Sequence, residues 1–408
     1  MGLRLIALAP LYLLVLASAS GQAPASALPS PIASGFTSVP SPAADGAAQP
    51  NLATDSRGRV WLSWLEPRAG GGHRLRLASL NGTRWSEPTT ITEGSTLLAN
   101  WADFPSVFIA ADGTMAVHWL ERGAGKPYGI RVRTSADSGR TWTPAISPHS
   151  DSSAGEFGFV SFYDAPGGGV GMVWLDGRGM SGHGGGHGSM ALRATTIRKG
   201  AGGEQAVLDP RVCECCQTSA ARTQDAVLVV YRDRSDKEIR DTSIVRFAGG
   251  KWSSPSTVHA DNWEINGCPV NGPVVTASGN AAAVAWFTGV GDAPKTLIAF
   301  SADAGRTFGD AIPVQSGPTL GRIAMIMPSP GRVLVSSLER ANPGARLVLR
   351  DVRRDGRASA PVEIAAATPD RTGGFARLAR TGSKLVVAWT DVRAGSPSAV
   401  RTAIAEVR

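Results

Sequence analysis

The sequence lacks a basic block, and after its first 20 residues it also lacks any long apolar run. Its 41 Lys and Arg residues exceed its 33 Asp and Glu residues, which gives a formal charge of +8, but the arginines are scattered along the chain. No nucleic-acid-binding motif accompanies this charge, so we expect an anionic ligand and no nucleic acid. No later run reaches about 18 apolar residues, so we expect no stable membrane insertion of the mature chain.

The N-terminal segment has the pattern of an export signal. Arg4 precedes a short apolar run, and the small residues at 17–19 form a cleavage pattern. We therefore predict a signal peptide over residues 1–20 and a flexible Ala/Ser/Pro-rich lead-in over 21–34. A single domain over 35–408 should then lie in the periplasm or be secreted.

One phrase recurs along the chain: a short apolar strand, a turn that usually contains Gly, and a second strand that often ends in Trp and an acid. A third alternating strand follows, and several copies continue into a short fourth strand that ends in Pro, such as "RWSEP" and "KWSSP". Four strands in about 50 residues are typical of a β-propeller blade. The copies begin at Asn51, Pro105, Phe159, Thr218, Gly272, Gly321 and Phe375.

The copies predict an all-β fold, a β-propeller of seven four-stranded blades. The last copy stops after its third strand, and "GFTSVPSPA" at 35–43 resembles the fourth strands of the others. We expect this N-terminal strand to close the ring, which removes the exposed edges of an open array. Six blades with one degenerate copy are the alternative. We expect a monomer.

Two loops between third and fourth strands are nearly identical: "SADSGRTW" at 135–142 and "SADAGRTF" at 301–308. Both match S-x-D-x-G-x-x-[WF], which resembles the Asp-box, or BNR repeat, of the sialidase superfamily. In a compact turn of this kind, the Asp accepts backbone hydrogen bonds and the Gly takes a positive φ.

The resemblance implies a carbohydrate-binding propeller and, with a catalytic set, a glycoside hydrolase of exo-sialidase type that needs no cofactor. Sialidases clamp a carboxylate with three arginines and use a Tyr nucleophile, a Glu that activates it, and an Asp acid/base. The R-I-P motif that usually carries the family's first arginine is absent here. Binding of acidic glycans with or without hydrolysis therefore stays open.

Candidate site residues follow the second strands, most of which end in an acid and an Arg. These charges form either blade-to-blade salt bridges and turn caps or a ring in which a few unpaired arginines bind a carboxylate, sulfate or phosphate of a ligand. The fourth copy, "VVYRDRSDKEIRD", offers Tyr231 as nucleophile and Glu238 as its base, and Asp176 is the candidate acid. The candidate substrate-binding residues are Arg178, Arg232, Arg234, Arg240 and Arg393.

The four cysteines lie in two segments that lead into neighbouring first strands, so the fold should bring them together. In an exported protein, we expect a disulfide from Cys268 to Cys213 or Cys215. The alternative is a non-catalytic propeller that binds a metal or another protein. For such a metal, thiolate and imidazole donors favour copper(I) over zinc. The candidate ligands are Cys213, Cys215, Cys216, Cys268, His183 and His187.

Overall fold

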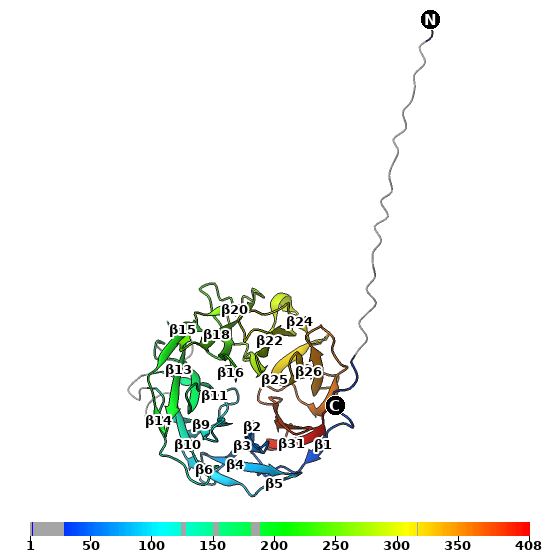
Figure 1. Cartoon of the computed structure of the whole chain (residues 1–408). Helices are drawn as coiled ribbons and strands as arrows, with labels where there is room; N and C mark the ends of the chain where they lie inside the picture. The colour runs from blue at the N-terminus through cyan, green and yellow to red at the C-terminus, as the bar shows by residue number, and fades with distance from the viewer. Residues whose placement is uncertain (1, 3–27, 124–127, 150–154, 181–187, 316) are drawn as a thin grey trace.

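The computed structural model describes Gly2 and residues 28–123, 128–149, 155–180, 188–315 and 317–408. Its strands form seven antiparallel sheets arranged as the blades of one ring (Figure 1). The predicted seven-bladed, all-β propeller is therefore confirmed. In the part of the chain that the structure describes, no helix has the length and hydropathy needed to cross a membrane.

The first three blades follow the chain from the inner strand outward. Blade 1 contains β2 (Ala48–Thr54), β3 (Val60–Pro67), β4 (His73–Asn81), β5 (Arg84–Trp85) and β6 (Thr89–Gly94). Blade 2 contains β7 (Leu97–Leu98), β8 (Ser106–Ile109), β9 (Met115–Arg122) and β10 (Tyr128–Ser135). Blade 3 contains β11 (Phe157–Asp164), β12 (Val170–Asp176), β13 (Met190–Arg198), β14 (Ala201–Gly202) and β15 (Ala206–Val212).

The remaining blades repeat this order. Blade 4 contains β16 (Ser219–Arg222), β17 (Val227–Arg232), β18 (Thr242–Ala248), β19 (Lys251–Trp252) and β20 (Ser256–His259). Blade 5 contains β21 (Val274–Ser278), β22 (Ala281–Thr288), the 3-10 turn η1 (Val290–Asp292), β23 (Lys295–Ser301) and β24 (Ile312–Pro313). Blade 6 contains β25 (Thr319–Ser329), β26 (Arg332–Arg340), β27 (Ala345–Arg353) and β28 (Val362–Ala367). Blade 7 contains β29 (Arg377–Thr381), β30 (Lys384–Asp391), β31 (Ala399–Glu406) and β1 (Thr37–Val39).

The N-terminal strand closes the ring as predicted. β1 pairs with β31, with Thr37 opposite Ile404 and Val39 opposite Thr402. The preceding residues 28–34 differ from our expectation of a flexible lead-in. Ile32 is 1% exposed and packs in the core between blades 6 and 7, because the segment lies against the last blades instead of extending into solvent.

The second strands are buried because each is covered by the two neighbouring blades. β12 and β17 are buried at every position, which explains why they contain continuous apolar runs instead of alternating ones. Each apolar core cluster contains residues from adjacent blades. One cluster, for example, contains Leu120 of blade 2 and Trp174 of blade 3. The hydrophobic core is therefore a ring of interfaces between blades.

The fourth strands begin later than predicted. The "RWSEP" and "KWSSP" segments supply only the short strands β5 and β19, and the longer outer strands β6 and β20 follow their prolines. Proline has no N–H to donate to a ladder. Accordingly, the chain leaves the third strand at Pro88 and Pro255 and pairs again beyond them.

The two Asp-containing loops share one geometry. Gly139 has φ +80° and its N–H donates to Ser135 Oγ at 2.9 Å, while Thr141 donates its N–H and its hydroxyl to Asp137. Hydrogen bonds from Thr141 and Ser135 lower the pKa of Asp137. The loop at 301–308 repeats each of these three contacts.

Candidate functional site

The inner strands surround a cavity of about 380 Å³ at the centre of the ring. Its wall is built from β2, β8, β11, β16, β21, β25 and β29 and from the residues that lead into them. Each blade presents its first strand to this central pocket, so a ligand there would contact side chains from all seven repeats.

Two arginines that face the central pocket form no direct ion pair with any carboxylate among the described residues. Arg322 is 9% exposed, and its guanidinium lies 3.9 Å from the ring centre of Phe375. Its Nη2 donates to the carbonyl of Arg371, whereas Nε and Nη1 are buried without a hydrogen-bond partner. Burial, followed by the charge of Arg371, lowers the pKa of Arg322 to about 10 against the opposing charge of Asp370, so Arg322 stays cationic at neutral pH.

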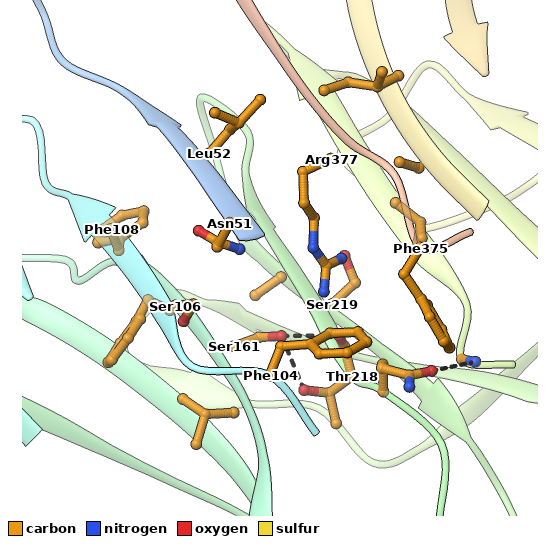
Figure 2. Close-up of a pocket in the computed structure, with 18 of the residues that line it drawn as sticks. Asn51, Leu52, Phe104, Ser106, Phe108, Ser161, Thr218, Ser219, Phe375 and Arg377 are labelled. Carbon is orange, nitrogen blue, oxygen red and sulfur yellow. Dashed lines mark hydrogen bonds between the residues drawn. The ribbon is translucent and has the colours of Figure 1, made fainter. Parts of the chain in front are cut away.

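Arg377 is the second of these arginines. It lies on β29, and its guanidinium carbon is 5.0 Å from the ring centre of Phe104. Figure 2 shows its side chain reaching into the pocket toward Ser219. Its Nε is buried without a partner, and burial lowers its pKa to about 10. Among the described residues, no carboxylate lies within ion-pair distance of Arg322 or Arg377.

Hydroxyl groups line the pocket opposite these cations. Thr218 donates to the carbonyl of Phe159, and its Oγ1 lies 2.9 Å from Ser161 Oγ (Figure 2). Ser106 and Asn51 also face the pocket. The pocket therefore combines cations, aromatic faces and neutral hydrogen-bonding groups.

Asp103 is the acid of the pocket wall. It is 2% exposed, and its Oδ2 has no hydrogen-bond partner. Burial raises its pKa to about 7, against the opposing hydrogen bond from the N–H of Phe159. A carboxyl group of this kind is largely protonated in mildly acidic solution and can then donate a hydrogen bond.

Tyr128 lies near Asp103 and is hydrogen-bonded to Glu156. Burial, and then the charges of Asp103 and Glu156, raise the pKa of the Tyr128 phenol. The structure thus brings together a tyrosine, a glutamate and an aspartate from blades 2 and 3. From the sequence, we predicted this combination at Tyr231, Glu238 and Asp176 instead.

The predicted catalytic tyrosine has different surroundings. Tyr231 is 1% exposed within the core between blades 3 and 4, and its hydroxyl donates to Asp209 at 2.6 Å. Burial and the neighbouring Asp209 raise its pKa, which disfavours the phenolate form. Its proposed base, Glu238, instead accepts hydrogen bonds from Arg234 and Arg240. These contacts argue against the pairing of Tyr231 with Glu238 that we predicted.

Most of the predicted substrate-binding arginines are paired with acids. Arg178 makes two contacts of 2.7 Å to Asp176, which is buried and also accepts from Trp174. Asp176 therefore anchors blade 3, and an acid/base role for it stays a prediction. Arg393 pairs with Asp391 at 3.0 Å. Arg178 and Arg393 each pair with the acid two residues earlier at the end of the same second strand, as expected for turn caps.

The arginines of blade 4 form a separate group. Arg234 and Arg240 both contact Glu214 and Glu238. Arg232 is 2% exposed and donates to backbone carbonyls, including that of Asn271 at 2.9 Å. Arg240 also donates to Cys213 Sγ at 3.3 Å. This group therefore faces the cysteines and not the central pocket.

The cysteines meet as predicted, but without the expected disulfide. All four thiols are free, and Cys213 Sγ lies 3.7 Å from Cys215 Sγ and 3.6 Å from Cys216 Sγ. Cys268 is hydrogen-bonded to Cys215. Hydrogen bonds from Cys215 and Cys216 hold the pKa of the Cys213 thiol well below its usual value. His183 and His187 lie outside the described residues.

Arg322 and Arg377 were not among the site residues predicted from the sequence. The signal was present: in "GRIAM" and "FARLAR", Arg322 and Arg377 each lie beside apolar residues in a first strand. An inner strand faces the channel, so an Arg there has few neighbouring acids to pair with.

Comparisons with known proteins agree on the fold. A scan against protein-family models gives no match, and a search of curated proteins gives none either. Among solved structures, an ulvan lyase of family PL25 bound to -[GlcA(1-4)Rha3S]- is 12% identical, with a TM-score of 0.55 over 91% of this chain and 96% of that one. A protein of unknown function from Dyadobacter fermentans is 17% identical, with a TM-score of 0.52 over 89% and 95%.

Sialidases are also among the similar structures. The Hadza microbial sialidase Hz136 is 13% identical, with a TM-score of 0.46 over 71% of this chain and 63% of that one. The structures with TM-scores above 0.5 show that the chain is a β-propeller in fold.

Proposed function

We propose that this chain is an exported propeller that binds acidic glycans in its central pocket. The observation that carries the proposal is the pair Arg322 and Arg377. Arg322 Nε and Nη1 and Arg377 Nε are buried without a hydrogen-bond partner, and an aromatic ring lies beside each guanidinium group. A carboxylate or sulfate would supply charge-assisted hydrogen bonds to such groups. Nothing in this arrangement requires a metal or cofactor.

The rest of the pocket suits a sugar ring. Phe104 and Phe375 contact one another edge to face and offer apolar surface, while Ser161 and Thr218 offer hydroxyl groups. Sugars present both apolar C–H faces and hydroxyl groups, so pockets that bind them combine these two kinds of surface. The ulvan lyase with a similar fold is bound to a chain that contains GlcA, which supports an acidic ligand.

Titration calorimetry with paired monosaccharides tests the proposal. N-acetylneuraminic acid and glucuronic acid should bind, whereas glucose, which lacks the carboxylate of glucuronic acid, should bind at least about tenfold more weakly. Arg322→Ala and Arg377→Ala should each weaken binding of the acid by about 10-fold to 100-fold, because each removes a charge-assisted contact.

Two further variants make the test specific. Arg84→Ala removes an exposed arginine from the outer strand β5, and it should leave the affinity unchanged. Tyr231→Phe should also bind the acid normally, because its phenol contacts Asp209 in the core. The proposal would be rejected if glucuronic acid and glucose bound with equal affinity. It would also be rejected if Arg84→Ala and Arg322→Ala weakened the binding of glucuronic acid equally.

The same proteins test hydrolysis of exo-sialidase type. Release of sialic acid from a sialoside that disappears in Tyr231→Phe would support the tyrosine chosen from the sequence. Release that persists in Tyr231→Phe and disappears in Tyr128→Phe would move the nucleophile to the tyrosine that is paired with Glu156.

A further inference from the structure

The four cysteines of the chain gather at one point between blades 3, 4 and 5. Cys213, Cys215 and Cys216 lie in the segment between β15 and β16, and Cys268 lies in the corresponding segment between β20 and β21. These segments are in close contact, since a Cβ on Gly272 would approach the carbonyl oxygen of Gln217 to 2.0 Å. The propeller repeat itself therefore brings the fourth thiol to the other three.

The spacing of the sulfur atoms matches that of a metal–thiolate site. The Sγ atoms of Cys213, Cys215 and Cys216 all lie within 4.8 Å of one another, with two distances of 3.6 and 3.7 Å. Four sulfurs around an ion at about 2.3 Å would be separated by about 3.8 Å along the edges of a tetrahedron. A disulfide would instead need about 2.05 Å. Three of the sulfurs therefore already have this spacing, and Cys268, which is hydrogen-bonded to Cys215, would have to move closer to the other two to complete a tetrahedron.

The charges around the thiols suit a negatively charged complex. Four thiolates and a divalent ion carry a net charge of −2, which is costly to bury without compensation. Arg240, whose side chain is 4% exposed, donates to Cys213 Sγ at 3.3 Å. Arg232 is buried nearby and forms no ion pair with a described carboxylate. Arg232 can therefore offset part of this charge, whereas Arg240 is also paired with Glu214 and Glu238 and acts mainly by orienting Cys213 through its hydrogen bond.

The burial of the thiols provides both protection and an entry route. Cys213 and Cys216 are each 1% exposed, Cys215 is half-buried and Cys268 is exposed. The backbone N–H of Cys213 donates to the carbonyl of Arg232, which fixes the start of the cysteine turn. Cys213 and Cys216 are thus shielded from solvent, whereas Cys268 is accessible to it.

We propose that Cys213, Cys215, Cys216 and Cys268 bind one thiophilic d10 ion. Zn²⁺ would take all four thiolates in a tetrahedral site, and Cu⁺ would take Cys213, Cys215 and Cys216. Each bound thiol releases its proton to solvent, and no electron is transferred. The site lies beside the central pocket, because Gln217 follows Cys216 and lines that pocket. It does not depend on the proposed glycan binding.

Metal titration of the reduced, full-length protein tests the site. We expect one equivalent of Zn²⁺ or Cu⁺ per chain, measured by elemental analysis after gel filtration under anaerobic conditions. Co²⁺ as a probe for the zinc site should give the visible bands of tetrahedral thiolate coordination. Metal-loaded wild type should resist alkylation by iodoacetamide at the bound cysteines, and a chelator should restore alkylation. This comparison needs no variant.

Variants then separate the two ions. Cys268→Ser should weaken Zn²⁺ binding by about 100-fold but change Cu⁺ binding less than about tenfold. Cys216→Ser should weaken the binding of both ions by about 100-fold. Arg240→Met, which keeps all thiols, should weaken binding by roughly 10-fold. Glu214→Gln changes the turn between the ligands without removing a thiol, so it should retain one equivalent.

Two results would overturn the proposal. Peptide mapping of protein purified without reductant could find disulfides within this cluster, and the reduced protein could then fail to bind either ion. Four free thiols that bind neither Zn²⁺ nor Cu⁺ with micromolar affinity would also reject it. The glucuronic acid titration is repeated with and without metal. Equal affinity in both titrations would show that metal binding by the cysteines and glycan binding in the central pocket are independent and can be tested separately.

Discussion

What a guanidinium group contacts determines whether an arginine of this protein can bind a ligand. Arg178 makes two short contacts to Asp176, so a ligand would have to displace a buried carboxylate. Arg322 is instead covered by Phe375 and has two N–H groups without partners. Because a buried donor without a partner is costly, a ligand acceptor gains more at Arg322 than at Arg178.

Asp103 should make the stability of the protein depend on pH. Its pKa is raised to about 7 in the folded state, above the ordinary value of 3.8, so the folded protein holds this proton more tightly than the unfolded chain. The contribution is therefore most favourable at low pH and is lost as the pH rises through about 7. Between pH 5 and 8, this one group should lower the free energy of unfolding by about 2 to 3 kcal/mol.

Urea denaturation at pH 5 and pH 8 measures this effect. Asp103→Asn, which cannot ionise, should lose less stability over that interval than wild type. Tyr128 and Glu156 are the neighbouring groups that also influence this region, and both remain in the variant. Glu87→Gln, at an exposed position, should keep the wild-type dependence. An identical pH dependence in wild type and Asp103→Asn would show that Asp103 is already ionised in the folded protein.

At the scale of elements, the loop at 301–308 joins the third and fourth strands of blade 5 through the carboxylate of Asp303. That carboxylate accepts N–H groups from Arg306 and Thr307 and the hydroxyl of Ser301. Asp303→Ala should lower the free energy of unfolding by about 1 kcal/mol, the usual cost of losing a side-chain cap on backbone donors.

The comparison variant for this loop is Asp310→Ala, which lies in the same connection and is exposed. Its unfolding free energy in urea should match that of wild type. Equal stability of Asp303→Ala and wild type would mean that the turn holds its shape through the backbone alone.

Elements that repeat could be predicted from the sequence, and elements that depend on one blade's neighbours could not. The seven inner strands follow from the recurring phrase, and β1 follows from its likeness to the outer strands. The outer strands β6 and β20 were placed too early, because the aromatic residue before the proline resembles a strand on its own. A local sequence pattern does not show at which residue the chain resumes pairing with the third strand after a proline interrupts the ladder.

The same distinction applies to the candidate sites. The meeting of Cys268 with Cys215 could be predicted, because it requires only that equivalent segments of adjacent blades are neighbours. The surroundings of Tyr231 could not, because whether a phenol faces the channel or Asp209 depends on which side of β17 packs on blade 3. Strands buried on both faces have no alternation that distinguishes the two sides.

For the whole molecule, closure of the ring by β1 should contribute much of the stability of blade 7. Val39 is 4% exposed, its carbonyl accepts from the Thr402 hydroxyl at 2.8 Å, and it pairs opposite Thr402. Val39→Asp should lower the free energy of unfolding by roughly 3 kcal/mol, because it removes buried apolar surface and places a charge there.

Ser38→Asp introduces the same charge one residue earlier, at an exposed position of β1. It should change the melting temperature little, while Val39→Asp and deletion of residues 35–43 should both lower it clearly. If the deletion melts at the wild-type temperature, the pairing of β1 with β31 contributes nothing to stability.

The pairing of Val39 with Thr402 also sets the order of events during synthesis, since these residues are 363 positions apart. At about 5 to 20 residues per second, β1 leaves the ribosome roughly 20 to 70 s before its partner strand exists. Until then the growing chain carries an unpaired strand at one end and an uncovered blade at the other, and both can pair with another nascent chain. Translation speed and chaperone supply should therefore affect the yield of this protein mainly through the last blade to be made.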